Sequence, residues 1–169
     1  MVTIRFEAKV FKIGSWTVLR LPKSASSKLP SRGMVMVEGT IDGSHFQAAL
    51  EPDGVGSHWF RVNKDMKGVV VVGMSPVKKW PESEMPEDLR KALAAAPQAY
   101  ATWMDITPMA RWDWIRWIGA TKQSQTRRRR IGVACSKLKA GDRRPCCFNR
   151  TQCTNPYVSN NGVLLEPTQ

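Results

Sequence analysis

Apolar and polar residues alternate through the first 80 residues, and this pattern predicts β-strands. Between Ile4 and Val10 every second residue is apolar and the residues between them are charged, as in a strand with one buried face. Asp42-Gly43 separates two such stretches and favours a type I′ turn that joins paired strands directly. Further strands are predicted to begin at Trp16, Met34, His45, His58 and Val69. Six short strands with glycine and proline at their joints predict a small β-barrel.

The pattern changes after residue 80, where proline and acidic residues indicate the starts of helices. Pro86 is followed by Glu87 and Asp88, which suit a first turn because the helix dipole favours acids there. This helix is predicted to end at Pro97, and a second short helix covers the sequence QAYATWM. Thr107-Pro108 is a cap followed by a first-turn residue, and it predicts a third helix over MARWDWIRWIGA.

The third predicted helix is rich in tryptophan. Its predicted buried stripe consists of residues at three-residue steps, namely Met109, Trp112, Ile115 and Ile118. Trp114 and Trp117 lie off that stripe. They are therefore the tryptophans that we expect to be available to a ligand. Trp16, Trp59, Trp103 and Trp112 are expected to pack inside the protein.

A last helix is predicted from Ser124 to Lys139, with Gly141 as its C-terminal residue. Its apolar stripe is formed by Ile131, Ala134, Cys135 and Leu138. Successive residues of a helix are about 100° apart, so the four adjacent arginines at 127–130 point in different directions. Arg127 falls on the stripe and must either leave the core by its long stem or meet a carboxylate, for which Asp113 is the expected partner, whereas Arg129 points to solvent. Arg128 and Arg130 lie on the flanks.

The net charge of +12 is concentrated in one segment. Residues 122–144 carry nine basic side chains against one acidic side chain, a net +8. This favours an anionic partner, such as nucleic acid, a phosphorylated ligand or a membrane surface. An ordinary solvated helix face is the alternative, since runs of charge commonly have that role. If a ligand binds, Arg128 and Arg130 supply cations and Trp114 and Trp117 supply aromatic surfaces.

The composition also bears on location and domain organisation. No stretch is apolar enough to cross a membrane and no signal peptide is present, so we expect a cytoplasmic protein without membrane insertion. Residues 1–80 are predicted to form the β-barrel domain, 84–144 a helical region and 145–169 an irregular tail. The expected fold class is thus α+β. The sequence does not predict an oligomeric state.

Residues typical of catalysis are scarce. His45 and His58 are the two histidines, and strand alternation leaves open a shared site or two ordinary strand side chains. The sequence has no glycine-rich phosphate loop and no Gly-x-Ser-x-Gly motif. We therefore expect a protein that is not an enzyme and has no cofactor.

The four cysteines leave three interpretations open. Cys135, Cys146, Cys147 and Cys153 could together bind zinc, but paired Cys-x-x-Cys spacing is missing. Neighbouring arginines could lower the thiol pKa and make the cysteines redox-active. Inert reduced thiols are the remaining interpretation, and no metal site is predicted.

Together these stretches resemble the bacteriocin-protection family, also described as YdeI or OmpD-associated, with a domain of unknown function in front. The resemblance rests on FEAKVFKIG, WTVLRLP and MVMVEGTIDGSHFQAALEPDGVGSHWFRVNK in the first half, and on MPEDLRKALAAAPQA, WIRWIGATKQSQTRRRRI and KLKAGDRRP in the second. It implies a barrel of the double-split type, similar in outline to AbrB-like DNA-binding proteins, followed by helices. It also aligns Lys122, Thr126, Arg127, Arg130 and Ile131 with a family pattern, so Lys122 joins the candidate ligand-binding residues. The expected role is non-enzymatic binding or stress protection, with nucleic-acid binding as the alternative.

Overall fold

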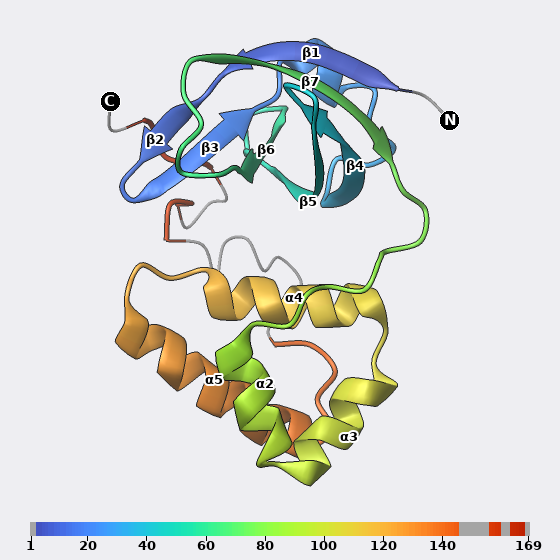
Figure 1. Ribbon diagram of the computed structural model, residues 1–169, viewed down its shortest axis with the longest axis vertical. Coiled ribbons are helices and arrows are strands. Elements are labelled where there is room, and N and C mark those ends of the chain that lie inside the picture. Colours follow the sequence, from blue (N-terminus) through green and yellow to red (C-terminus); the bar gives the residue numbers. More distant parts are fainter. Residues whose placement is uncertain (1–2, 146–155, 160–162, 168–169) are drawn as a thin grey trace. The chain divides into compact units, whose positions relative to one another are not determined.

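The computed structural model describes residues 3–145, 156–159 and 163–167. The chain divides into two compact units: unit 1 is Met1–Lys79 with Tyr157–Gln169, and unit 2 is Trp80–Pro156. Unit 1 is built of strands with one short helix, and unit 2 is built of helices (Figure 1). The predicted α+β class, a barrel-like sheet followed by helices, is confirmed. None of the helices in the described residues is long and apolar enough to cross a membrane.

Unit 1 contains a seven-stranded antiparallel sheet in the order β1-β7-β4-β5-β6-β3-β2. Its elements are β1 (Ile4–Lys9), β2 (Phe11–Ile13), β3 (Trp16–Arg20), α1 (Lys23–Ser26), β4 (Val35–Ile41), β5 (Ser44–Pro52), β6 (His58–Arg61) and β7 (Val69–Pro76). Only Val10 separates β1 from β2. Because β1 pairs with β7 and β2 pairs with β3, one stretch of chain supplies both outer strands and curls the sheet into a barrel-like form.

The predicted hairpin at Asp42-Gly43 is confirmed. β4 and β5 pair from Val35↔Leu50 to Ile41↔Ser44, so two residues form the connection. Asp42 has φ 48° and Gly43 has φ 86°, the left-handed values that a type I′ turn requires. The turn is also attached to β7, because Asp42 Oδ1 accepts a hydrogen bond from the backbone N–H of Val71 at 2.8 Å.

The core of unit 1 follows the alternation in the sequence. Ile4 of β1, Val37 of β4, Leu50 of β5 and Val72 of β7 are fully buried and belong to one apolar cluster. Their neighbours along each strand point the other way, as the period-two pattern predicts. The predicted burial of Trp16 and Trp59 is also confirmed, as is that of Trp103 in unit 2, whereas Trp112 is half-buried.

The end of the chain returns to unit 1. Tyr157, Val158 and Leu164 are buried there. The hydroxyl of Tyr157 accepts a hydrogen bond from the backbone N–H of Ser15 at 3.1 Å, and Leu164 N donates to Asp53 O at 2.9 Å. The described part of the predicted irregular tail therefore contributes buried side chains to the strand-rich unit.

Unit 2 consists of α2 (Glu87–Ala94), α3 (Pro97–Asp105), α4 (Pro108–Gly119) and α5 (Ser124–Lys139) in its described residues. The Thr107 side chain accepts a hydrogen bond from Ala110 N at 3.2 Å, so the predicted cap of α4 is confirmed. The apolar cluster of this unit includes Leu89 and Leu93 of α2, Trp103 of α3, Ile118 of α4 and Leu138 of α5.

The predicted boundaries of α5 agree with the structure. Gly141 has φ 95° and donates to Leu138 O at 2.9 Å, while Asp142 N donates to Lys137 O at 2.9 Å. These two bonds form a Schellman motif that ends the helix. Ile131, Ala134 and Leu138 are buried and Cys135 is half-buried, so the predicted apolar stripe is confirmed.

Candidate functional site

The four adjacent arginines of α5 have different surroundings, beginning with Arg127. Its Nε donates to Asp88 Oδ2 at 2.7 Å and its Nη2 donates to Asp88 Oδ1 at 3.0 Å. The side chains remain 31% and 46% exposed, respectively. The hydrogen bonds from Arg127 lower the pKa of the Asp88 carboxyl. Arg127 therefore joins α5 to the first turn of α2, and the expected pairing with Asp113 is wrong.

Arg130 is engaged at the end of α4. Its Nη1 donates to Trp117 O at 2.7 Å and to Ala120 O at 2.9 Å, two carbonyls at the C-terminal end of the helix, where the last C=O groups lack the usual i+4 donor. Trp117 O also accepts from Ala120 N at 3.4 Å. The guanidinium also lies 5.3 Å from the centroid of the Trp117 ring. Partial burial lowers the pKa of Arg130. The structure thus brings Arg130 and Trp117 together, but it gives Arg130 a capping contact.

Arg128 and Arg129 extend to solvent. Neither side chain makes a hydrogen bond or ion pair with another part of the chain that the structure describes. Lys122, just before the helix, is also exposed. No acidic residue occurs anywhere in the 16 residues of α5. We call these three exposed cations, Lys122, Arg128 and Arg129, the α5 cation cluster.

Trp114 differs from its expected placement. It is fully buried, as are Ala110, Asp113 and Ile118 of the same helix, whereas Met109 is 38% exposed. The buried face of α4 therefore follows steps of three and four residues, and the predicted stripe through Met109 and Trp112 had the wrong phase. Trp114 Nε1 donates to Arg143 O at 3.1 Å. Because its ring is enclosed, Trp114 is not a surface on which a ligand could stack.

Asp113 is a buried carboxylate within unit 2. Its side chain has no exposed area, and it forms ion pairs with Arg144 and, at 3.9 Å, with Arg116. Arg143 beside it pairs with Asp105 at 2.9 Å. The segment after α5 is thus attached to α3 and α4 by two consecutive arginines. The expected structural role of Asp113 therefore involves Arg144 and Arg116 as partners.

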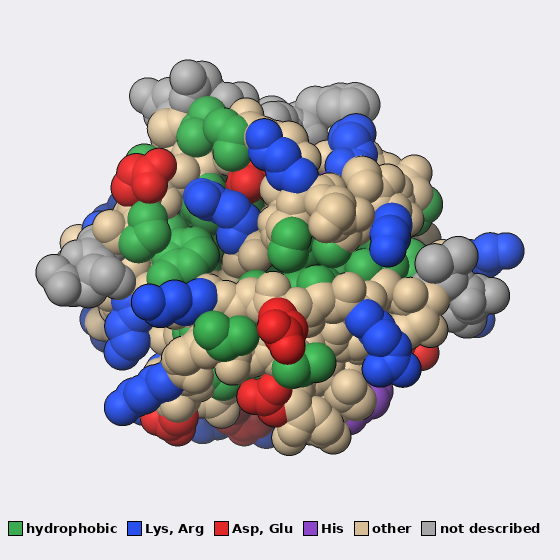
Figure 2. All heavy atoms as spheres, turned by 90° about the horizontal axis from the view of Figure 1, so that it is seen from above, with side chains coloured by type: hydrophobic (Ala, Val, Ile, Leu, Met, Phe, Trp, Pro, Cys, Tyr) green, Lys and Arg blue, Asp and Glu red, His purple; other side chains and the backbone are tan. Residues whose placement is uncertain are grey.

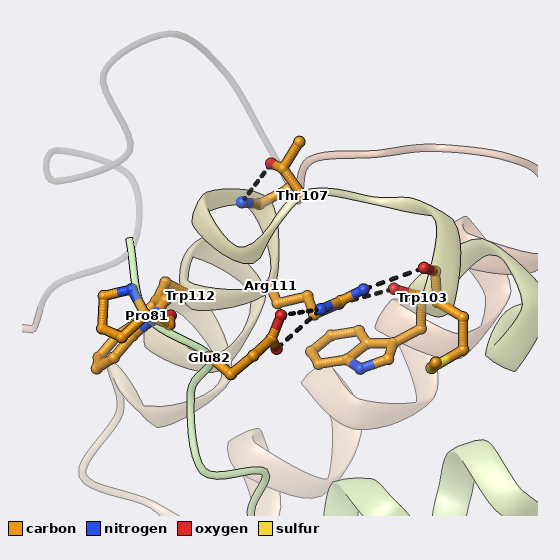
Figure 3. Close-up of polar contacts among 8 residues, drawn as sticks. Pro81, Glu82, Trp103, Thr107, Arg111 and Trp112 are labelled. Atoms are coloured by element: carbon orange, nitrogen blue, oxygen red, sulfur yellow. Dashed lines mark hydrogen bonds and ion pairs between the residues drawn. The ribbon is translucent and has the colours of Figure 1, made fainter. Parts of the chain in front are cut away.

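Arg111 makes contacts that the sequence pattern did not predict. It points between Glu82 and the end of α3 (Figure 3). Nη1 donates to both carboxylate oxygens of Glu82 at 2.6 and 2.8 Å, and Nε and Nη2 donate to the carbonyls of Trp103 and Met104 at 2.9 and 3.0 Å. Trp112 Nε1 donates to Pro81 O at 2.8 Å. These contacts fix residues 81 and 82 to α4. The one sequence signal for them was the position of Arg111, four residues and thus about one helical turn after the cap residue Thr107.

The two histidines are in different surroundings. His45 is exposed, whereas His58 is 1% exposed. His58 Nε2 lies 2.8 Å from Gly33 O, and Nδ1 lies 2.6 Å from Ser26 Oγ. A carbonyl can only accept, so Nε2 carries the proton and Nδ1 accepts from the Ser26 hydroxyl. Burial lowers the pKa of His58, and Ser26 has no exposed area, so this serine and histidine are enclosed.

Cysteines and carboxylates do not form a metal site in the described residues. No group of three or more His, Cys, Asp or Glu side chains there could hold a metal ion. Cys135 is half-buried, and burial raises the pKa of its thiol, which opposes thiolate reactivity. The zinc and redox interpretations involve Cys146, Cys147 and Cys153, which lie outside the described residues.

The fold and the site define a basic α+β protein in which an arginine-rich helical unit accompanies a barrel-like sheet. Residues 82–141 match the family described as bacteriocin-protection, YdeI or OmpD-associated. Residues 6–68 match the domain of unknown function DUF1905. The chain thus contains a domain that matches the bacteriocin-protection, YdeI or OmpD-associated family in its second half and DUF1905 in its first half. The comparison with curated proteins gives no match.

Proposed function

We propose that this protein is a non-enzymatic, cytoplasmic binding protein whose ligand is anionic and contacts Lys122, Arg128 and Arg129. The observation that supports this proposal is the exposure of Arg128 and Arg129 without a partner in the described residues. Arg127 and Arg130, on either side of them, are engaged by Asp88 and by the end of α4. An anion bound at the α5 cation cluster would reduce the repulsion between these cations.

The surroundings of the polar residues favour binding over catalysis. Ser26 and His58 resemble a nucleophile and a base in hydrogen-bond distance, but a substrate would have to reach two side chains that are 0% and 1% exposed. The buried Asp113 is engaged by two arginines. The description of the family names protection against bacteriocins and no reaction. The proposed function therefore includes protection of a bacteriocin-sensitive cell.

An extended polyanion such as nucleic acid is the second candidate, and the length of the exposed face favours it. Exposed residues continue along α5 from Arg128 and Arg129 through Gly132 and Ser136 to Lys139. At 1.5 Å per residue, Arg129 and Lys139 are about 15 Å apart along the axis. Several successive phosphates fit that distance, whereas one small anion would contact only part of it.

The test is binding of a fluorescein-labelled 20-base-pair duplex, followed by fluorescence anisotropy at several salt concentrations. We expect binding to weaken as salt is added. The logarithm of the association constant, plotted against the logarithm of the salt concentration, should have a slope of about −0.9 for each phosphate contacted. The variant Arg128→Ala/Arg129→Ala should flatten the slope by about two such units. Inorganic phosphate, titrated as a competitor and directly by calorimetry, distinguishes a small anion from a polyanion.

The matched control is Lys64→Ala/Lys67→Ala, which removes the same charge from exposed positions of unit 1. It should leave the slope almost unchanged. Equal effects of the two double variants would contradict a role for the α5 cation cluster, because binding would then depend on net charge alone. Absence of both duplex and phosphate binding at low salt would refute the proposal. Survival of bacteriocin-treated cells that express the parent or the Arg128→Ala/Arg129→Ala variant tests the protective role.

A further inference from the structure

The sheet of unit 1 has an unpaired strand edge between β5 and β6. β5 pairs with β4 over seven residues, Ser44–Leu50. On its other side it pairs with β6 only at Glu51 and Pro52. From residue 49 back to residue 45, that side of β5 has no ladder partner among the described residues. We call this stretch the open edge of β5.

The register identifies the backbone groups on the open edge. Ile41 and Ser44 close the two-residue hairpin, and the closing pair of such a hairpin is hydrogen-bonded. Alternation along the antiparallel ladder then turns the N–H and C=O groups of residues 44, 46 and 48 toward β4. The same groups of His45, Gln47 and Ala49 face the opposite way. Three successive donor and acceptor sets are therefore available to an added strand.

The open edge lacks the usual protection against strand pairing. Natural edge strands are commonly interrupted by charged residues or proline, or are very short. The sequence from Ser44 to Leu50 is SHFQAAL, which contains no Lys, Arg, Asp, Glu or Pro. Such an edge is suited to pairing, so its sequence favours an interaction surface.

Apolar side chains border the open edge. Phe46 and Ala48 of β5 are only partly buried, and they pack on the core cluster of unit 1 together with Val62 and Met66, which follow β6. The rings of Phe46 and Phe60 are stacked with centroids 5.5 Å apart. An added strand would therefore find hydrogen-bonding groups on one side and apolar side chains below it, the two components of recognition by strand addition.

Charge distinguishes between the candidates for the added strand. The segment after β6 carries exposed Lys64 and Lys67 and one acidic residue, Asp65. The whole chain has a net charge of +12, and Figure 2 shows Lys and Arg side chains, with Asp and Glu between some of them, beside exposed hydrophobic ones on one face. A second copy of the chain would be repelled, whereas an acidic peptide would be attracted. We propose that an extended acidic segment of a partner protein, with alternating apolar residues, adds as a strand to the open edge of β5.

The probe is a blocked seven-residue peptide that alternates glutamate and valine, titrated against the full chain by calorimetry. The comparison peptides replace glutamate with lysine, or carry N-methyl groups on alternate amides. We expect the lysine peptide to bind at least about tenfold more weakly, because the basic segment repels it. N-methylation should abolish binding, because it removes the donors that pair with the strand while leaving the charge unchanged.

Two variants locate the binding site. Gln47→Pro removes a donor that faces away from β4, a position where an edge strand tolerates proline, and should weaken binding about tenfold or more. Gln47→Ala keeps the backbone N–H and should bind like the parent. Lys64→Ala/Lys67→Ala should weaken binding several-fold and reduce its dependence on salt. Arg128→Ala/Arg129→Ala should bind the peptide normally, so this result is independent of the test of the α5 cation cluster.

The proposal is overturned if the N-methylated and unmodified peptides bind equally, since binding would then not involve strand pairing. This comparison uses the parent protein and holds even if Gln47→Pro does not fold. Equal binding of the glutamate and lysine peptides would also overturn it. Sedimentation velocity provides the remaining outcome: a dimer of the parent that Gln47→Pro dissociates would identify a second copy of the chain as the added strand and contradict an acidic partner.

Discussion

Arg127 and Arg129 show how far one residue type can differ in role within half a turn of a helix. Arg127 lies on the side of the buried Ile131, and the helical spacing placed it there correctly. Its partner Asp88 is 39 positions away on another helix, so no local pattern contains it. The spacing of residues thus predicts which side chains turn inward, whereas the identity of a partner depends on tertiary packing. The wrong choice of Asp113 had this cause.

Replacement of Arg127 tests this difference. Arg127→Ala should lower the free energy of unfolding by about 1 kcal/mol, because the pair is bidentate but a third to a half exposed. Arg129→Ala should change it by at most about 0.5 kcal/mol in either direction. The free energy of unfolding of Arg127→Lys should lie between those of the parent and Arg127→Ala, since an ammonium cannot donate two parallel hydrogen bonds as a planar guanidinium does. Urea unfolding followed by circular dichroism at 222 nm reports on the helices of unit 2.

A double-mutant cycle with Asp88→Ala separates this ion pair from other effects of the substitutions. Asp88 also accepts a hydrogen bond from its neighbour Leu89 N at 2.9 Å, and the cycle cancels that contribution. A coupling free energy near zero, or an equal loss for Arg127→Ala and Arg129→Ala, would contradict the assigned contact.

At the scale of elements, the two long helices differ in how well their sequences predicted them. α5 has glycine just beyond its end and a single apolar stripe, so its boundaries and its buried face were both predictable. α4 has apolar residues around most of its circumference, and several stripes are then compatible with its sequence. Its actual buried face includes the charged Asp113, which a hydrophobicity pattern assigns to solvent. Long-range pairing with Arg144 permits that burial.

Two glycines of the α5 region should respond to alanine in opposite directions. Gly132 lies within the helix, and an added Cβ there meets nothing within 4 Å, so Gly132→Ala should stabilise unit 2 by about 0.5–1 kcal/mol. Gly141 has φ 95° in the Schellman motif, so Gly141→Ala should destabilise it by about 1 kcal/mol. The urea midpoints of both variants provide the measurement. A shift of both midpoints in the same direction would contradict the assigned conformations.

At the scale of the whole molecule, the strand order and the packing of the tail depend on contacts between distant parts of the sequence. Local patterns of apolar and polar residues could not predict them. The alternation of residues predicted the strands and one hairpin, but not that β1 and β2 would occupy the two outer positions of the sheet. Tyr157 reaches Ser15 across 142 positions, and the tail contains too few apolar residues for a local pattern to indicate this. Of the residues that the sequence offered for ligand binding, Arg130 and Trp114 are occupied by contacts within unit 2.

His58 of β6 holds the segment between β3 and β4 through its imidazole ring, and this contact should make the stability of unit 1 sensitive to pH. Ser26, the last residue of α1, and Gly33, in the loop between α1 and β4, lie on either side of the imidazole, and Arg32 and Asp53 are the charged groups that influence it. Burial holds the pKa of His58 below the ordinary value of 6.5. The unfolded chain therefore binds a proton near pH 6.5, while the folded protein does not until the pH is lower. Stability from this group is complete above pH 6.5 and is lost as the pH falls toward the folded pKa.

We therefore expect the free energy of unfolding to fall between pH 7 and pH 5, with a slope of up to about 1.4 kcal/mol per pH unit from His58. This window lies above the ordinary pKa of the carboxyl groups, so their titration contributes little. His58→Gln should be less stable at pH 7 but should lose most of the slope, because the remaining side chain does not titrate. His45→Gln, at the exposed histidine, is the matched control and should retain the slope of the parent. Urea unfolding at half-unit pH intervals, followed by tryptophan fluorescence and circular dichroism, measures both profiles. If the slope of unfolding free energy against pH persisted in His58→Gln and disappeared in His45→Gln, the pH dependence would come from His45. That result would contradict the neutral, enclosed state of His58.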